Sequence, residues 1–142
     1  MIRPYNDTDK EKLLALCKEF WQATCLEYGE FDLAHTEAKL EQYIANGACL
    51  VTDDVEGFIL LCESTALCSS TPIAAEVAWY VSPEARGRCG MELLKAAFSY
   101  CEVKKIKFLS MMYMQSSMPD SIVKIYDKMG LELRETTYIK RF

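Results

Sequence analysis

The sequence lacks several features that mark particular classes of protein. It holds one histidine, His35, and its seven cysteines form no Cys-x-x-Cys pair, so we expect no zinc site. An odd number of cysteines, several of them in apolar stretches, is typical of buried thiols in a reducing cytoplasm. No apolar run approaches the ~20 residues of a membrane-crossing helix, and the N-terminus has no secretory signal pattern. We therefore expect a cytoplasmic protein that holds no metal and makes no membrane contact.

Basic side chains are also fewer than acidic ones, 16 against 21. The net charge is −5, whereas nucleic-acid-binding proteins usually carry a basic face, so no nucleic-acid partner is expected. The phosphate-binding pattern G-x-x-x-x-G-K-[ST] is absent, and so is the dinucleotide pattern G-x-G-x-x-G between Val81 and Leu94. What remains is a chain of 142 residues, 51% hydrophobic and 26% charged. This balance suits a single globular domain over residues 1–142.

The most informative stretch runs from Val81 to Leu94. It follows an apolar, β-branched and aromatic run and leads into an amphipathic segment, which is the layout strand, turn, helix. A helix N-terminus has unsatisfied N–H groups and the positive end of a dipole, so such a turn can bind an anion. The residues that favour this are two glycines and two arginines: Gly87, Gly90, Arg86 and Arg88. The alternative is an ordinary connection whose arginines are solvated.

Hydrophobic periodicity predicts the elements around this turn. Asp7 or Thr8 can cap a first helix, and Thr36 a second. The expected set is a strand at 2–5, helices up to 26 and from 36 to 46, strands at 48–52, 57–63 and 75–81, a helix at 89–103, a strand at 108–113, a helix at 121–129, and a final strand within 131–140. The order β-α-α-β-β-β-α-β-α-β belongs to the mixed α/β class.

Three segments, in this order along the chain, resemble one known family. The start reads I-R-P, the turn reads V-x-P-x-x-R-G followed by a glycine and a leucine pair, and residues 125–131 read I-Y-D-K-M-G-L. This arrangement resembles the GNAT family of N-acetyltransferases. The turn is one residue shorter than the family's usual Q/R-x-x-G-x-G/A loop and is nearer to the variant R-G-x-R-x-G of compact members. The matching residues are Val81, Pro83, Arg86, Gly87, Gly90, Leu93 and Leu94.

The resemblance implies a mostly antiparallel central sheet flanked by helices. It implies an enzyme that transfers an acetyl group from acetyl-CoA directly to a primary amine of a small molecule or protein. In the family, the strand before the turn pairs through its backbone with the pantetheine arm, and the turn holds the pyrophosphate. The implied cofactor-binding residues are Trp79, Tyr80, Val81, Arg86, Gly87, Arg88, Cys89, Gly90 and Met91.

Two residues are candidates for the proton transfers of this reaction. By resemblance, Tyr126 faces the thioester sulfur and acts as general acid, since a phenol is protonated at neutral pH. Its other interpretation is aromatic packing in the last helix. Glu76 is a lone acid in an apolar strand, so it either points to solvent or lies in a cleft with a raised pKa as the general base. A bulge in this strand would change the face on which it lies.

Alternatives to direct acetyl transfer stay open at this stage. A non-catalytic module could keep the fold and CoA binding but use its surface to bind another protein, because fold alone does not establish activity. Cys89, at a predicted helix N-terminus, could act as a nucleophile in a covalent mechanism. A homodimer through the last strand is a further open alternative.

Overall fold

The computed structural model describes all 142 residues. They form two compact parts, Met1–Met112 and Tyr113–Phe142, and each is described by itself.

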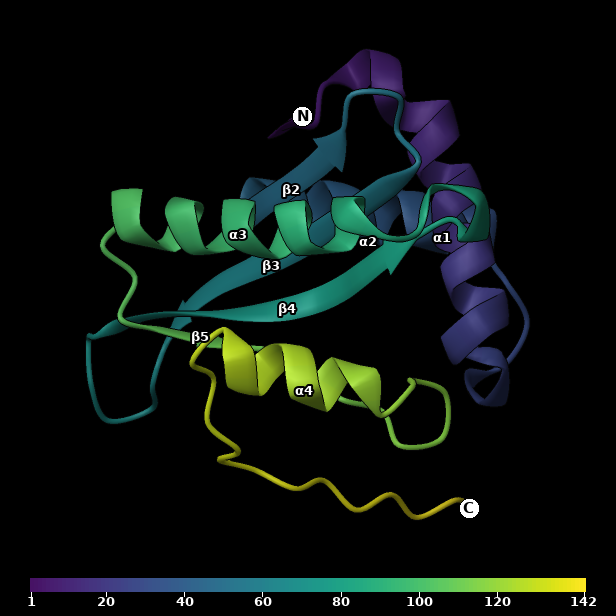
Figure 1. Ribbon diagram of the computed structural model, residues 1–142. Coiled ribbons are helices and arrows are strands. Elements are labelled where there is room, and N and C mark those ends of the chain that lie inside the picture. Colours follow the sequence, from purple (N-terminus) through teal and green to yellow (C-terminus); the bar gives the residue numbers. More distant parts are fainter. The chain divides into compact units, whose positions relative to one another are not determined.

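The first part is built on a five-stranded sheet (Figure 1). The strands follow one another in space as they do in the chain, and each pair is antiparallel except the last, which is parallel. A parallel pair requires a crossover, and a helix supplies it here. The strands are β1 (Ile2–Pro4), β2 (Gly47–Thr52), β3 (Gly57–Thr65), β4 (Pro72–Val81) and β5 (Phe108–Ser110). The expected mixed α/β class with a mostly antiparallel sheet is confirmed.

Helices cover both faces of this sheet and create two cores. On one face, α1 (Lys10–Thr24) and α2 (Leu33–Ala45) pack over a core that contains Leu13, Leu40 and Phe58. On the other face, α3 (Arg88–Val103) packs Leu93 and Ala97 onto the sheet. In Figure 1, α3 crosses in front of the strands while α2 lies behind them. Three short 3₁₀ turns complete this part: η1 (Asp7–Asp9), η2 (Leu26–Tyr28) and η3 (Pro83–Ala85).

The capping residues of the first two helices differ from those that the sequence predicts. Asn6, not Asp7 or Thr8, caps η1, the 3₁₀ turn that leads into α1: the Asn6 side chain accepts from the Thr8 N–H, and its own N–H donates to Asp9 in a capping box. The second helix begins at Leu33, not Thr36, because Asp32 accepts from the backbone N–H of His35. Several neighbouring side chains can cap in both places, and sequence alone does not rank them.

The second part, Tyr113–Phe142, contains one helix, α4 (Ser121–Lys128). Gly130 follows it with a positive φ of 79°, and the N–H of Leu131 donates to the C=O of Tyr126 at 3.0 Å. This is the glycine-terminated helix end of a Schellman motif.

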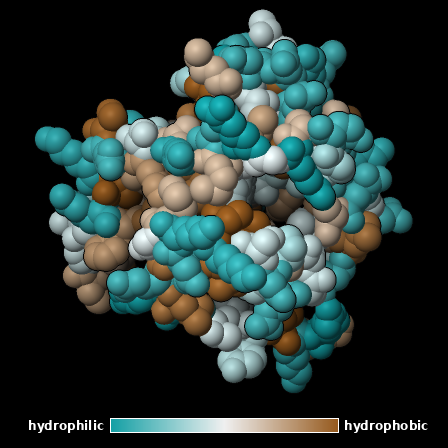
Figure 2. Space-filling model, viewed as in Figure 1, coloured by the Kyte–Doolittle hydropathy of each residue, from teal (hydrophilic) through white to brown (hydrophobic).

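The strand expected within 131–140 does not form, so the predicted order is wrong in its last element. A strand needs a partner whose N–H and C=O groups complete its ladder, and no strand pairs with this segment. Its apolar side chains stay exposed, including Leu133 and Tyr138. Figure 2 shows apolar residues interspersed with hydrophilic ones on the face in view, without a continuous apolar band. None of the helices has the length and apolar composition to cross a membrane.

Candidate functional site

The central feature of the site is the point where β4 and β5 separate. The two strands pair only from Ile73 to Ala75 on β4, although β4 continues to Val81. The predicted strand at 108–113 is therefore formed only at 108–110. Beyond this point the β5 side of β4 carries no strand. This leaves one edge of a long strand without a neighbouring strand for most of its second half.

Glu76 lies at this separation point. Its Oε2 accepts a hydrogen bond from the backbone N–H of Met112 at 2.9 Å, just after the last paired residue of β5. The Glu76 residue is only 5% exposed. Burial raises its pKa from 4.5 to about 7, while the hydrogen bond from Met112 opposes this rise. Of the two sequence interpretations, the structure therefore contradicts the solvent-facing one and supports a buried carboxyl that titrates near neutrality.

A β-bulge next to Glu76 sets which way the strand faces. The register of β3 with β4 shifts between Leu60 and Leu61, so Val77 is an extra residue. Val77 and Ala78 both pack on the α1–α2 side, whereas Glu76 is paired with Leu61, which packs under α3. The bulge that the sequence analysis considered is present. Strict alternation of side chains along β4 would have placed Glu76 and Ala78 on the same face of the sheet, whereas they lie on opposite faces.

The backbone at the end of β4 faces outward. The N–H of Ser82 donates to the C=O of Glu56 on the β3 side at 2.8 Å. Because polar backbone groups alternate along a strand, those of Val81 face away from β3. Consistent with this, the Val81 C=O accepts from the Nε of Arg86 at 3.4 Å. Trp79 and Val81 have side chains that pack on the α3 side, while Tyr80 packs on the α1–α2 side.

The turn after β4 delivers the chain to the N-terminus of α3. Gly87 is the N-cap residue, with a φ of 126° that L side chains rarely adopt. No side chain caps this helix, so its first N–H groups are not satisfied by a capping side chain. A helix of 16 residues places the positive end of its dipole there. The turn predicted from sequence therefore has the geometry of an anion site.

The residues of this turn differ in their contacts and in their exposure to solvent. A Cβ added at Gly90 would lie 3.7 Å from the Trp79 ring and 4.0 Å from Val81, which are ordinary contacts. Packing within the protein therefore does not require glycine at this position. Arg88 is 90% exposed, and its Nε pairs with Glu92 at 2.6 Å, so its charge is partly compensated. Cys89 and Met91 are half-buried in the first turn of α3.

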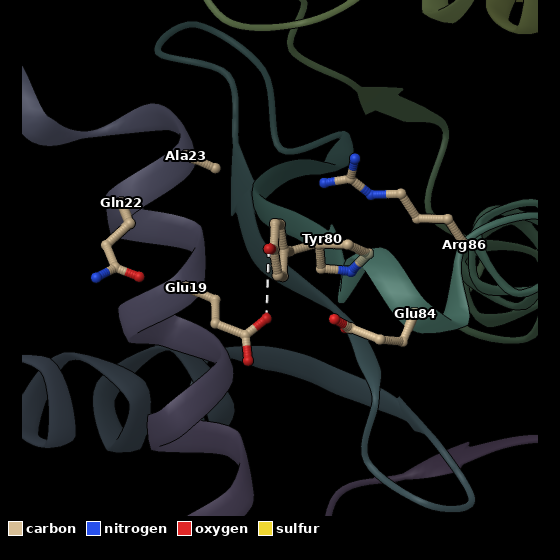
Figure 3. A pocket seen from close by; sticks show the side chains of 7 residues that line it. Glu19, Gln22, Ala23, Tyr80, Glu84 and Arg86 are labelled. Carbon is tan, nitrogen blue, oxygen red and sulfur yellow. Dashed lines mark hydrogen bonds between the residues drawn. The ribbon is translucent and has the colours of Figure 1, made fainter.

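A cavity of about 450 Å³ lies beside the end of β4, on the α1 side (Figure 3). The hydroxyl of Tyr80 hydrogen-bonds to Glu19 Oε2 at 3.4 Å. Burial, followed by the charge of Glu19, raises the pKa of Tyr80. In Figure 3 the carboxylates of Glu19 and Glu84 lie on one side of Tyr80 and the Arg86 guanidinium on the other. The remaining residues around the cavity are Gln22, Ala23 and Pro83.

Sequence reasoning did not identify Glu19 or Glu84 as site residues. Glu84 lies inside the recognised turn pattern, so its position was a usable signal. Glu19 is one of two acids on α1, and only the docking of α1 against β4 brings it to Tyr80.

Tyr126 belongs to the second part of the chain. It is half-buried on α4, and its C=O accepts from the N–H groups of Met129 and Leu131. The spacing Y-x-x-x-G that pointed to Tyr126 thus has a structural explanation as well, because Gly130 terminates the helix that carries it.

No protein-family model matches the sequence, and no curated protein matches it. Solved structures match over the whole chain. A ribosomal-protein-alanine N-acetyltransferase from Brucella melitensis biovar Abortus has a TM-score of 0.76 and 16% identity, covering 100% of this chain and 99% of its own.

Two further structures illustrate the range of the match. The aminoglycoside N-acetyltransferase AAC(6')-Iy, in complex with the bisubstrate analogue CoA-S-monomethyl-acetylneamine, has a TM-score of 0.72 and 24% identity, covering 100% of this chain and 98% of its own. A protein from Bacillus halodurans described as a transcriptional regulator has a TM-score of 0.77 and 12% identity, covering 100% and 99%. These three proteins have different names, but each shares its architecture with this chain. The chain therefore has the fold of the GNAT N-acetyltransferases.

Proposed function

We propose that the protein is an N-acetyltransferase that uses acetyl-CoA and acts on a primary amine by direct transfer. The observation that carries this proposal is the placement of Glu76. A buried carboxyl with a pKa of about 7 lies where β4 and β5 separate, on the strand that leads to a helix N-terminus suited to an anion. Such a group can accept a proton near neutral pH.

Acetyl-CoA supplies the thioester in this reaction, and the residues of the chain fit it in two places. The exposed N-terminus of α3 and the guanidinium of Arg86 suit its pyrophosphate. Gly90 leaves room there that packing of the protein does not need. The outward-facing backbone of Val81 suits the amides of the pantetheine arm. The structures of AAC(6')-Iy were solved with CoA and with a CoA-containing analogue, which supports the same ligand for this fold.

The chemical step follows from these assignments. The amine nitrogen forms a bond to the thioester carbonyl carbon, and the C–S bond then breaks. Glu76 takes the proton that the amine loses, directly or through a water. Tyr126 gives a proton to the departing thiolate. No covalent bond to Cys89 is required, so the kinetics should not be ping-pong.

The proposal is tested by measuring CoA binding and acetyl transfer separately. Calorimetric titration with CoA should show binding, and Gly90→Leu should weaken it by about ten-fold or more, because the side chain fills the space beside Trp79. Gly90→Ala is the matched control, since its added Cβ makes only ordinary contacts. A thiol-release assay with acetyl-CoA and a panel of amines should give turnover.

The results discriminate between the proposal and its main alternative. Absence of CoA binding by the native protein would overturn the assigned cofactor site. Binding of CoA without turnover on any amine would favour the non-catalytic module, which keeps the fold and the ligand but not the reaction.

A further inference from the structure

The turn that joins β2 to β3, residues 53–56, is tied to the end of β4 through one peptide group. The N–H of Gly57 donates to the Oγ1 of Thr52 at 3.1 Å. The C=O of the same peptide, which belongs to Glu56, accepts from the N–H of Ser82 at 2.8 Å. A trans peptide is planar, and its N–H and C=O point in opposite directions. The Thr52 hydroxyl therefore holds one side of this peptide, and Ser82 is bound to the other.

Thr52, the last residue of β2, is buried and carries two of these bonds. Its residue is 7% exposed, and its Oγ1 also accepts from the N–H of Glu56 at 2.9 Å. Two backbone N–H groups thus depend on one oxygen, and removing it leaves them without that acceptor. Hydrogen bonds that follow one another through a peptide polarise each other, so loss of the hydroxyl also weakens the bond from Ser82.

The turn is also fixed in a conformation that its sequence does not favour. Val55 has a positive φ of 56°, which β-branched residues rarely adopt. Its side chain is buried in the core under α1 and α2, and its N–H donates to the Thr52 C=O at 2.9 Å. Strain of this kind persists only where the surroundings determine the backbone, and it is concentrated near functional sites. The turn is therefore a rigid support for the elements that it contacts.

Gly57 brings this support against both elements of the candidate cofactor site. A Cβ added at Gly57 would lie 3.0 Å from Cγ2 of Val81 and 3.2 Å from Cδ1 of Leu93. Val81 is the β4 residue whose backbone faces outward, and Leu93 is fully buried on α3. Both distances are shorter than ordinary contacts, so the turn, the end of β4 and α3 meet here without spare room.

From these contacts we propose that Thr52 is a positioning residue of the cofactor site. Through the peptide between Glu56 and Gly57, it fixes the end of β4 and hence the place where Val81 and the N-terminus of α3 present their backbone to acetyl-CoA. This inference rests on the proposed function, because it concerns the binding of the same acetyl-CoA.

The experiment removes and then restores the hydroxyl of Thr52. Thr52→Val keeps the shape of the side chain without its acceptor, whereas Thr52→Ser keeps the acceptor. Thr52→Val should raise the Kd for CoA about ten-fold, the effect of about one net hydrogen bond on an equilibrium constant. The KM for acetyl-CoA should rise by the same factor, with a much smaller change in kcat at saturating acetyl-CoA. Thr52→Ser should restore the Kd to within about two-fold of the native value.

Two further measurements separate positioning from a general loss of stability. Leu40→Ala removes a buried side chain of α2 and should lower the free energy of unfolding in urea without changing the Kd for CoA. In Thr52→Val, hydrogen exchange should become faster at the Ser82 amide while the amides of α2 keep their native rates. If Thr52→Val does not fold, Gly57→Ala tests the same support, because its methyl group presses on Val81 and Leu93 and should also weaken CoA binding.

The outcomes distinguish this inference from the proposed function. If the native protein binds CoA and Thr52→Val binds it equally tightly, the inference is overturned and the cofactor site stands. An equal loss of affinity in Leu40→Ala, or no recovery in Thr52→Ser, would also overturn it, as would unchanged affinity in Gly57→Ala where that variant is the test. If the native protein does not bind CoA, the proposed function fails, and the inference about a cofactor site falls with it even where Thr52→Val speeds exchange at Ser82.

Discussion

Replacing Glu76 by Gln removes one titrating group from the interior and should change how stability depends on pH. Glutamine keeps the shape of the side chain and an oxygen that can accept from the Met112 N–H. In the native protein, burial raises the pKa of Glu76 from 4.5 to about 7. This difference corresponds to about 3 kcal/mol between the protonated and ionised forms.

The sign of the effect follows from proton binding. Between pH 4.5 and about 7, the folded protein holds a proton on Glu76 that the unfolded chain has lost. The free energy of unfolding therefore falls as the pH rises through this interval. The contribution of protonated Glu76 is fully present below pH 4.5 and is lost above about 7. Glu76→Gln lacks this loss, so its stability relative to the native protein should increase by about 3 kcal/mol from pH 4.5 to 8.

Urea unfolding at a series of pH values measures this difference directly. Other titrating groups contribute equally to both proteins, so they cancel in the subtraction. Glu102→Gln, an exposed acid on α3, should track the native protein at every pH. If the free energies of unfolding of the native protein and Glu76→Gln differ by the same amount at every pH from 4.5 to 8, the assignment of Glu76 as a buried carboxyl that keeps its proton below pH 7 is refuted.

The same variant carries a kinetic expectation. If Glu76 is the general base, Glu76→Gln should lower kcat by about 10²- to 10⁴-fold. The native rate should rise with pH through about 7 as Glu76 becomes ionised. The variant should lack that rise near pH 7 and regain part of its rate at high pH, where free amine is abundant. An unchanged kcat would remove Glu76 from the reaction without affecting the stability argument.

Two further variants probe other parts of the molecule. Tyr126→Phe keeps the ring and removes the hydroxyl, so turnover should fall by about 10²- to 10⁴-fold while the thermal midpoint stays almost unchanged; a large loss of stability with normal turnover would assign Tyr126 to packing. Asp9→Asn weakens the two hydrogen bonds from the Arg3 guanidinium, at 2.7 and 2.9 Å, and the capping bond from the Asn6 N–H. It should therefore lower the free energy of unfolding by about 1–3 kcal/mol at neutral pH. The contact with Arg3 lowers the pKa of Asp9, so this stabilisation should vanish as the pH falls below the pKa of Asp9 in the folded protein. A difference in unfolding free energy between the native protein and Asp9→Asn that persists in acid would contradict the assignment.

Much of the architecture could be predicted because it is encoded locally. The helical spacing of Leu13, Leu16 and Cys17 predicted α1, and these residues are buried in the core. The apolar runs of β2, β3 and β4 predicted three strands that lie side by side. The turn after Val81 was identified from its glycines and from the strand and helix on either side, and all three are present.

The properties that depend on contacts between distant segments could not be predicted. The environment of Glu76 depends on a register shift opposite Leu60 and Leu61 and on the N–H of Met112, which lies 36 residues away. The cavity depends on the approach of Glu19 to Tyr80 across 61 residues. A final strand was predicted within residues 131–140, but a strand also needs a neighbour that completes its hydrogen-bond ladder, and the local sequence does not supply one.

The extra residue at Val77 has a consequence for how this strand can vary. Residues before and after it follow opposite alternation, so Glu76 and Tyr80 are presented to different sides of the sheet even though their spacing is even. Substitutions on one side of Val77 can thus alter one face without disturbing the other. Deleting Val77 would remove this independence, because every side chain before or after it would have to exchange faces. A single backbone irregularity therefore lets one strand contribute to two separate chemical environments, each free to change on its own.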